Sequence, residues 1–277
     1  SSSSAASDVY KRQMLGQKNY LVILQNNNEL RPTGGFIGTI AQGKLSNGLV
    51  EKLDIRTVYD LDGQLNEWLI PPGPLQTVNH RLFLRDSNWF VNFPDSARQL
   101  SIMYEKSSGE TPDLIMAVTP DVFIEFLNLT GPITLPAYNV TITPDNFVEQ
   151  IQASTSVAYD KQANQPKQLL ADLYPALMQR INELSKGQPA LMLGVLQKQL
   201  SRKNILLYSR DQNLQNKLAL YRWDGAVADF AGDYLYINSA NLNGSKTDLA
   251  LERSATLTTN IEPVSYTHLR AHETGRN

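Results

Sequence analysis

The feature that most restricts the fold is a short, continuous apolar run at residues 19–25, which reads Asn-Tyr-Leu-Val-Ile-Leu-Gln. An uninterrupted apolar run of this length is typical of a strand that is buried on both faces. Residues 113–118 form a second such run, and segments with helical periodicity flank both. Because strands alternate with helices, we expect a three-layer α/β/α sandwich with a central mixed sheet that contains both runs.

Helix boundaries are predicted by proline, glycine and capping residues. Pro94 begins a helix that runs to about Ser107 and ends before Gly109. Two Thr-Pro-Asp triplets, at residues 119–121 and 143–145, place a cap residue, a proline and an acidic residue where a helix begins. The longer predicted helices are residues 166–185, within which Pro175 should introduce a kink, and residues 189–202.

Further strands are predicted by apolar runs between turn residues. Residues 36–42 and 49–58 are expected to be two strands joined by the turn Ser46-Asn47-Gly48, in which Asn-Gly supplies the positive φ. The remaining predicted strands are residues 133–135, 204–209, 234–239 and 248–258. After about residue 230 the pattern turns toward β structure, so we expect residues 231–263 to be the start of a truncated C-terminal β-rich segment.

The two ends of the chain differ from the rest. Residues 1–13 and 264–277 show no periodicity and resemble translated sequencing-adapter sequence. We expect both to be non-native tails that pack against nothing, because segments without an apolar face cannot offset their ordering entropy. Natural termini without regular structure are the alternative. The α/β domain is then predicted at residues 14–230, and the natural body is expected to be a fragment.

Composition excludes several classes of function. The 277 residues contain no Cys, which excludes disulfides, zinc–thiolate sites, iron–sulfur clusters and a Cys nucleophile. His80 is the one histidine outside the two ends, so a Ser-His-Asp enzyme or a multi-His metal site is not expected. The 25 Lys and Arg against 27 Asp and Glu create no basic field, so we expect no nucleic-acid partner.

The first candidate site is the segment Arg31-Pro32-Thr33-Gly34-Gly35, directly after the predicted strand at residues 19–25. Open α/β sheets bind ligands beyond the carboxyl ends of their strands. Paired glycines let backbone N–H groups approach an anion, and Arg31 would add a bidentate donor. A tight turn with a solvated arginine is the alternative.

The second candidate site is the segment Leu84-Arg85-Asp86-Ser87-Asn88-Trp89, which is followed by Asp95 and Arg98. Charged and amide side chains here lie in a loop that leads into a helix N-terminus. Such a position favours binding of an oxyanion or a phosphate, and Asp86 is available for a hard cation. The alternative is a capped turn in which Asp86 pairs with Arg85 or Arg98 and Trp89 anchors the core.

Two weaker candidates are an acidic pair and a polar helix entry. Asp60 and Asp62 lie two residues apart, an arrangement that suits Mg²⁺, although an acidic turn explains the pair equally simply. Lys167 lies beside Gln168 at the predicted start of a helix, where solvated charges are the usual interpretation.

Taken together, these segments resemble the hallmark of a bacterial family, domain of unknown function 4012. The resemblance is carried by residues 26–36, 58–62, 84–89, 93–97, 129–132 and 241–248, and it covers nearly all of residues 19–260. Members of this family usually carry an upstream transmembrane helix and are extracytoplasmic. The resemblance therefore implies an extracytoplasmic protein that is anchored to the bacterial cytoplasmic membrane by a helix upstream of this fragment.

That family is distantly similar to the LytR-CpsA-Psr glycopolymer transferases. These enzymes use Mg²⁺ to move a glycopolymer from a polyprenyl-pyrophosphate carrier to a cell-wall or protein hydroxyl. Arg31, the Arg56 to Asp60 stretch and Lys167 fall at or near the three transferase motifs. A magnesium-assisted phosphotransferase would use Arg31, Arg85 and Asp86 as catalytic residues, and Asp60, Asp62 and Asp86 as metal ligands. The residues that this hypothesis assigns to pyrophosphate binding are Arg31, Thr33, Gly34, Gly35, Arg56, Arg85, Arg98 and Lys167.

The sequence also departs from the transferase pattern. Thr33 and Gly34 stand where the first transferase motif has its Asp, the Pro-Arg-Asp run is not intact, and the late arginine pair is reduced to Lys167. A non-catalytic envelope module that binds a glycan, a lipid carrier or a partner protein is therefore the alternative to a phosphotransferase. Both hypotheses predict that Arg31 and Arg85 bind an anionic head group.

Overall fold

The structure is a computed structural model that describes residues 17–46, 49–156, 165–242, 248, 251–260 and 266–275. A five-stranded sheet with the strand order β3-β2-β1-β4-β7 forms its centre. The strands are β1 (Gln17–Asn26), β2 (Phe36–Ser46), β3 (Leu49–Thr57), β4 (Leu114–Val118) and β7 (Ile205–Ser209). Strand β1 pairs parallel with β4, whereas the other neighbours are antiparallel, so the predicted mixed sheet is confirmed.

Strand β1 contributes side chains to two separate cores, one on each face of the sheet. Leu21 and Ile23 belong to the core that also contains residues of α3 (Phe93–Ser108). Val22 and Leu24 pack against the core on the other face. This alternation explains why the sequence of the strand is apolar without interruption.

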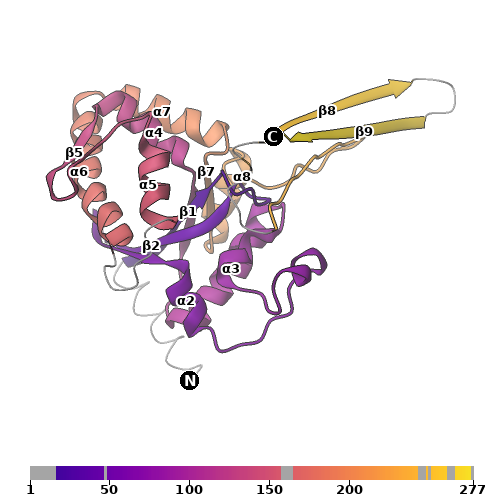
Figure 1. Cartoon of the computed structure of the whole chain (residues 1–277), viewed down its shortest axis with the longest axis horizontal. Helices are drawn as coiled ribbons and strands as arrows, with labels where there is room; N and C mark the ends of the chain where they lie inside the picture. The colour runs from indigo at the N-terminus through magenta and orange to yellow at the C-terminus, as the bar shows by residue number, and fades with distance from the viewer. Residues whose placement is uncertain are drawn as a thin grey trace.

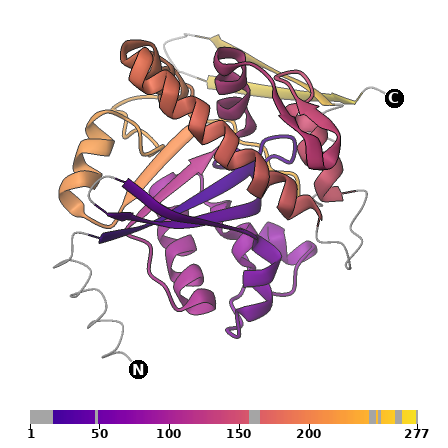
Figure 2. The same cartoon turned by 90° about the vertical axis from the view of Figure 1, so that its left-hand side faces the viewer.

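Helices cover both faces of the sheet and complete the three predicted layers (Figure 2). Helices α2 (Val58–Gln64) and α3 cover the face to which Leu21 and Ile23 belong. The helices on the opposite face are α4 (Pro120–Thr130), α5 (Phe147–Ser156), α6 (Gln165–Gly187) and α7 (Pro189–Ser201). No helix in the described residues is long and apolar enough to span a bilayer.

The predicted helix boundaries have identifiable local causes. Gly109 ends α3 with a φ of 75°, and its N–H group donates to the carbonyl of Glu105 at 2.8 Å. Thr119 precedes α4 as predicted, but its hydroxyl lies 3.2 Å from Asp121 Oδ2 and does not cap a backbone N–H group. The Thr143 hydroxyl accepts from the Asn146 N–H group at 3.2 Å, just before α5 begins.

Three segments differ from the sequence prediction. Residues 58–64 form helix α2 and not a strand end followed by an acidic turn. Helix α8 (Gln212–Leu220) was not predicted, although Asp211 caps it by accepting from the Leu214 N–H group at 2.9 Å. Residues 234–239 form no strand, because no neighbouring strand in the described part of the chain satisfies their backbone groups.

The C-terminal part contains a two-stranded hairpin that projects from the sandwich (Figure 1). Strand β8 (Leu251–Asn260) pairs antiparallel with β9 (Tyr266–Gly275). Strand β9 lies within residues 264–277, so the expectation that this tail contacts nothing does not hold for the backbone of β9. Residues 1–13 and the turn residues Asn47 and Gly48 lie outside the described residues.

Three short elements are 3-10 helices: η1 (Gly73–Thr77), η2 (Leu84–Trp89) and η3 (Pro136–Tyr138). A small hairpin is formed by β5 (Ile133–Leu135) and β6 (Val140–Ile142). Helix η2 is the element that matters for the candidate site. It lies between α3 and β2 and carries Arg85, Asp86 and Asn88.

Candidate functional site

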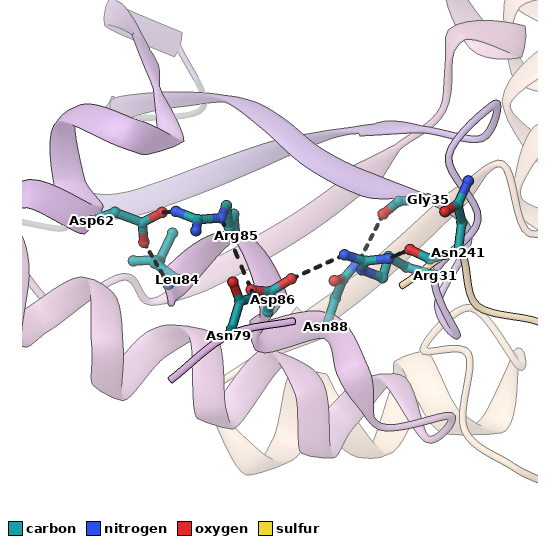
Figure 3. A network of polar contacts seen from close by, with 9 residues as sticks. All are labelled: Arg31, Gly35, Asp62, Asn79, Leu84, Arg85, Asp86, Asn88 and Asn241. Carbon is teal, nitrogen blue, oxygen red and sulfur yellow. Dashed lines mark hydrogen bonds and ion pairs between the residues drawn. The ribbon is translucent and has the colours of Figure 1, made fainter. Parts of the chain in front are cut away.

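Arg31 lies in the loop between β1 and β2, close to η2, and only 4% of it is exposed. Its Nη2 atom donates to Asp86 Oδ1 at 3.0 Å, and its Nη1 atom donates to the backbone carbonyl of Asn241 (Figure 3). The guanidinium carbon lies 5.4 Å from the centre of the Phe36 ring. Both terminal nitrogens of this predicted anion-binding arginine are therefore engaged inside the protein.

Asp86 is the centre of the polar network and is 1% exposed. Besides Arg31, it accepts from Asn79 Nδ2 at 2.8 Å, and Arg85 Nε lies 4.0 Å from its second oxygen. Asp86 thus pairs with Arg31 first and with Arg85 second, whereas Arg98 pairs with Asp95. The adjacent Trp89 packs against the core, as the capped-turn alternative expected.

A second ion pair joins η2 to α2. Arg85 Nη1 donates to Asp62 Oδ2 at 2.7 Å, and the Leu84 N–H group donates to Asp62 Oδ1 at 2.6 Å. Burial raises the pKa of Asp62 above its ordinary value, and the Arg85 charge partly opposes that rise. Two arginines and two carboxylates that were predicted as site residues therefore meet in one network: Arg31, Arg85, Asp62 and Asp86.

The predicted glycine pair shapes the loop beside this network. Gly34 has a φ of 136°, and its N–H group donates to the Arg31 carbonyl at 2.9 Å. A Cβ atom on Gly35 would lie 2.2 Å from the Asn26 carbonyl oxygen, so only glycine fits there. Asn88 Nδ2 donates to the Gly35 carbonyl at 2.7 Å. The Gly34 N–H group is therefore used in a hydrogen bond within the loop, and the Gly35 carbonyl is used in a hydrogen bond to η2.

Thr33 completes this turn from its buried side. Its hydroxyl accepts from Gln25 Nε2 at 2.6 Å, and both residues are less than a tenth exposed. Thr33 therefore ties the loop to the end of β1.

A distant segment closes over the Arg31 loop. The Asn241 N–H group donates to the Leu30 carbonyl at 2.9 Å, and the Leu30 N–H group donates to Asp248 Oδ2 at 2.9 Å. Burial alone would raise the pKa of Asp248, but hydrogen bonds from Leu30, Arg253 and Asn241 outweigh burial and lower it. The C-terminal segment is thus fastened to the loop by both backbone and side-chain contacts.

The remaining predicted residues lie apart from one another. Arg56 pairs with Asp54 at 2.6 Å on β3, and Arg98 pairs with Asp95 at 2.5 Å on α3. Asp60 is exposed on α2, although Asp62 on the same helix is buried. Lys167 lies in the first turn of α6, and its side chain lies outside the described residues.

Asp62 and Asp86, two of the three residues proposed as magnesium ligands, do not fit that ion in this arrangement. Both oxygens of Asp62 and both oxygens of Asp86 already accept hydrogen bonds from the chain itself. Within the described ranges, no group of three or more His, Asp or Glu side chains could hold a metal ion. Mg²⁺ at Asp62 or Asp86 would have to displace these internal donors to reach near-octahedral coordination, so the two carboxylates form no ready Mg²⁺ site in this arrangement.

The sequence analysis missed Asn79 and gave no site role to Asn241, whereas Asn88 lies within the second candidate segment that it named. Asn79 and Asn88 complete the network, and Asn241 reaches it across 210 positions. No periodic pattern in the sequence links Asn241 to Arg31, because the two residues are 210 positions apart.

The structure is an α/β sandwich in which one buried arginine–carboxylate pair, Arg31–Asp86, joins the β1–β2 loop to η2. The family model described as protein of unknown function (DUF4012) matches residues 15–155, which include β1, the Arg31 loop and η2. The chain belongs to this family. A search of curated proteins found no match.

Several solved structures are similar to this chain at low sequence identity. The Lin1025 protein from Listeria innocua is 13% identical with a TM-score of 0.40, and the alignment covers 75% of this chain and 80% of that one. Protein gbs0355 from Streptococcus agalactiae is 11% identical with a TM-score of 0.47, and the alignment covers 78% and 76% of the two chains.

Proposed function

We propose that this protein is an extracytoplasmic, membrane-anchored module of the bacterial envelope that binds a polyprenyl-pyrophosphate-linked glycan without transferring it. The proposal takes the ligand class from the resemblance to the glycopolymer transferases. We propose that no transfer occurs because the candidate catalytic side chains are paired with one another inside the protein. Arg31 and Asp86 are both almost fully buried and paired with each other at 3.0 Å.

The pairing of these four side chains carries the proposal. A pyrophosphate-transferring site needs cations that are free to take up the charge of the leaving phosphate. Here the Arg31 charge is balanced by Asp86, and the Arg85 charge is balanced by Asp62. Replacing these internal partners by a ligand would leave two buried carboxylates unpaired, which is strongly unfavourable.

Binding remains feasible at Arg85. Its side chain is 19% exposed, in contrast to 3% for that of Arg31. Its Nη2 atom has no hydrogen-bond acceptor in the described part of the chain, so this edge of the guanidinium can donate to an anion.

The second candidate function is the magnesium-assisted phosphotransferase, with Arg31, Arg85 and Asp86 as catalytic residues. The convergence of these three residues with Asp62 in one network favours it. This function would require the carboxylates to leave their arginines when substrate binds, and Asp60 to act from the exposed side of α2.

One experiment separates the two functions. A fluorescent polyprenyl-pyrophosphate–sugar analogue is titrated into the protein with and without Mg²⁺, and its products are followed by chromatography with a hydroxyl acceptor present. The binding module predicts saturable binding that does not depend on Mg²⁺, an Arg85→Ala variant that binds at least about 10-fold more weakly, and no transfer. Mg²⁺-dependent transfer would establish the phosphotransferase, and the absence of any binding would contradict both.

A further inference from the structure

Arg81 and Phe83, which precede η2, form a stack of alternating arginine and aromatic side chains with Arg85 of η2 and Tyr59 of α2. The Arg85 guanidinium carbon lies 3.8 Å from the centre of the Phe83 ring and 5.3 Å from that of Tyr59. The Arg81 guanidinium carbon lies 4.8 Å from the centre of the same Phe83 ring. Two arginines and two aromatic rings from different elements are thus in contact with one another.

This stack orients the donors of both arginines. A guanidinium group in contact with an aromatic face keeps its in-plane N–H groups at the edge, where they can meet an oxygen. Arg85 uses Nη1 for Asp62, and Arg81 uses Nη1 for the Leu65 carbonyl at 3.3 Å. In the described residues Arg81 has no carboxylate partner, so its charge is available to a ligand.

The aromatic component of the stack is accessible. Tyr59 is 56% exposed, and partial desolvation raises its pKa above the ordinary value of 10.0, so the phenol is neutral at physiological pH. A neutral exposed ring offers an apolar face beside the guanidinium edges. Aromatic faces and hydrogen-bond donors together suit a ligand with one apolar face and one anionic group.

We infer that Arg81, Phe83, Arg85 and Tyr59 form a binding site for a sugar phosphate. The phosphate oxygens accept from the free guanidinium edges of Arg81 and Arg85, and the sugar ring stacks on Tyr59. This inference rests on the proposed function for the kind of ligand. It assigns the anion contact to the partly exposed Arg81 and Arg85 and not to the buried Arg31. The phosphate belongs either to a soluble sugar phosphate or to a carrier-linked sugar, which present the same chemistry to the site.

The test measures binding of two probes to the whole chain. Glucose 1-phosphate represents the soluble source, and the polyprenyl-pyrophosphate–sugar analogue represents the carrier-linked source. The Arg81→Ala variant should bind both at least about 10-fold more weakly, because a charge-assisted hydrogen bond is lost. Lys198→Ala, which removes an exposed cation of α7 that pairs with Glu125, is the control and should bind as the wild type does.

A second variant isolates the sugar contact. Tyr59→Leu keeps an apolar side chain but removes the aromatic face, so the preference for glucose 1-phosphate over inorganic phosphate should disappear. Retention of that preference would overturn the stacking contact. Circular dichroism and thermal unfolding establish that each variant is folded.

Each outcome decides one of the two claims. If the carrier analogue binds to the wild type and to Arg81→Ala equally well, the site inference is overturned and the proposed function stands. If only glucose 1-phosphate binds and binding requires Arg81, the site is established and the carrier-binding function fails. If neither probe binds to the wild type, both are overturned.

Discussion

Replacing Asp86 by alanine should destabilise the protein more than any exposed charge substitution. Asp86 is 1% exposed and accepts from Arg31 at 3.0 Å and from Asn79 at 2.8 Å. Its removal leaves the Arg31 charge buried without a carboxylate, because the other partner of Arg31 is the neutral carbonyl of Asn241. Removing one partner of a buried ion pair typically costs about 3–5 kcal/mol.

This loss is large enough to measure by urea unfolding. With an m-value of about 3 kcal/mol/M for a chain of this size, the midpoint should fall by about 1–2 M urea. Asp95→Ala is the matched control, since the Asp95–Arg98 pair is exposed and such pairs contribute about 0.2–1 kcal/mol.

A double substitution separates the lost charge balance from the lost packing. Arg31→Met combined with Asp86→Leu removes both charges, and it should be much less destabilising than the sum of Arg31→Met and Asp86→Leu. Equal midpoints for Asp86→Ala and Asp95→Ala would refute the argument, because Asp86 would then contribute no more than an exposed carboxylate.

Three further predictions concern the loop and the C-terminal segment. Gly35→Ala should destabilise the protein by about 1–3 kcal/mol in urea unfolding, since the new Cβ would lie 2.2 Å from the Asn26 carbonyl oxygen; wild-type stability would contradict this. Because the folded-state pKa of Asp248 is lowered from 3.8, its stabilisation is present above that pH and is lost as the pH falls through the folded value. Unfolding curves between about pH 6 and 2 should therefore show a smaller acid-induced loss for Asp248→Asn than for the wild type. Asp248→Ala should speed amide hydrogen exchange at Leu30 and Asn241, and unchanged exchange at both would show that this carboxylate does not fasten the segment.

Local signals in the sequence were sufficient to predict the three layers of the fold. The apolar run in β1 is buried on both faces, and Gly109 ends α3 where its positive φ allows the chain to turn. Helix α2 was not predicted, because its acidic residues Asp60 and Asp62 resemble an acidic turn. Its apolar buried side consists only of Val58, Leu61 and Leu65. A helix with one short buried side is difficult to distinguish from a polar turn.

The site could be predicted only in part, because its contacts join distant positions. Arg31, Arg85 and Asp86 were each singled out, but the pairing of Arg31 with Asp86 spans 55 positions. Nothing in the local sequence distinguishes an arginine that binds a ligand from one that is paired inside the fold. The difference depends on burial, which follows from the packing of the β1–β2 loop against η2 and Asn241.

The most direct test of the account measures which arginines are accessible and which are protected by ligand. The whole chain is treated with a dicarbonyl reagent specific for arginine, with and without the polyprenyl-pyrophosphate–sugar analogue, and modified sites are mapped by mass spectrometry. The account predicts that Arg31 stays unmodified in both samples, that the ligand protects Arg81 and Arg85, and that Arg98 reacts in both. Reaction of Arg31 at the rate of Arg98, or protection of Arg31 by ligand, would contradict the claim that Arg31 is paired inside the fold.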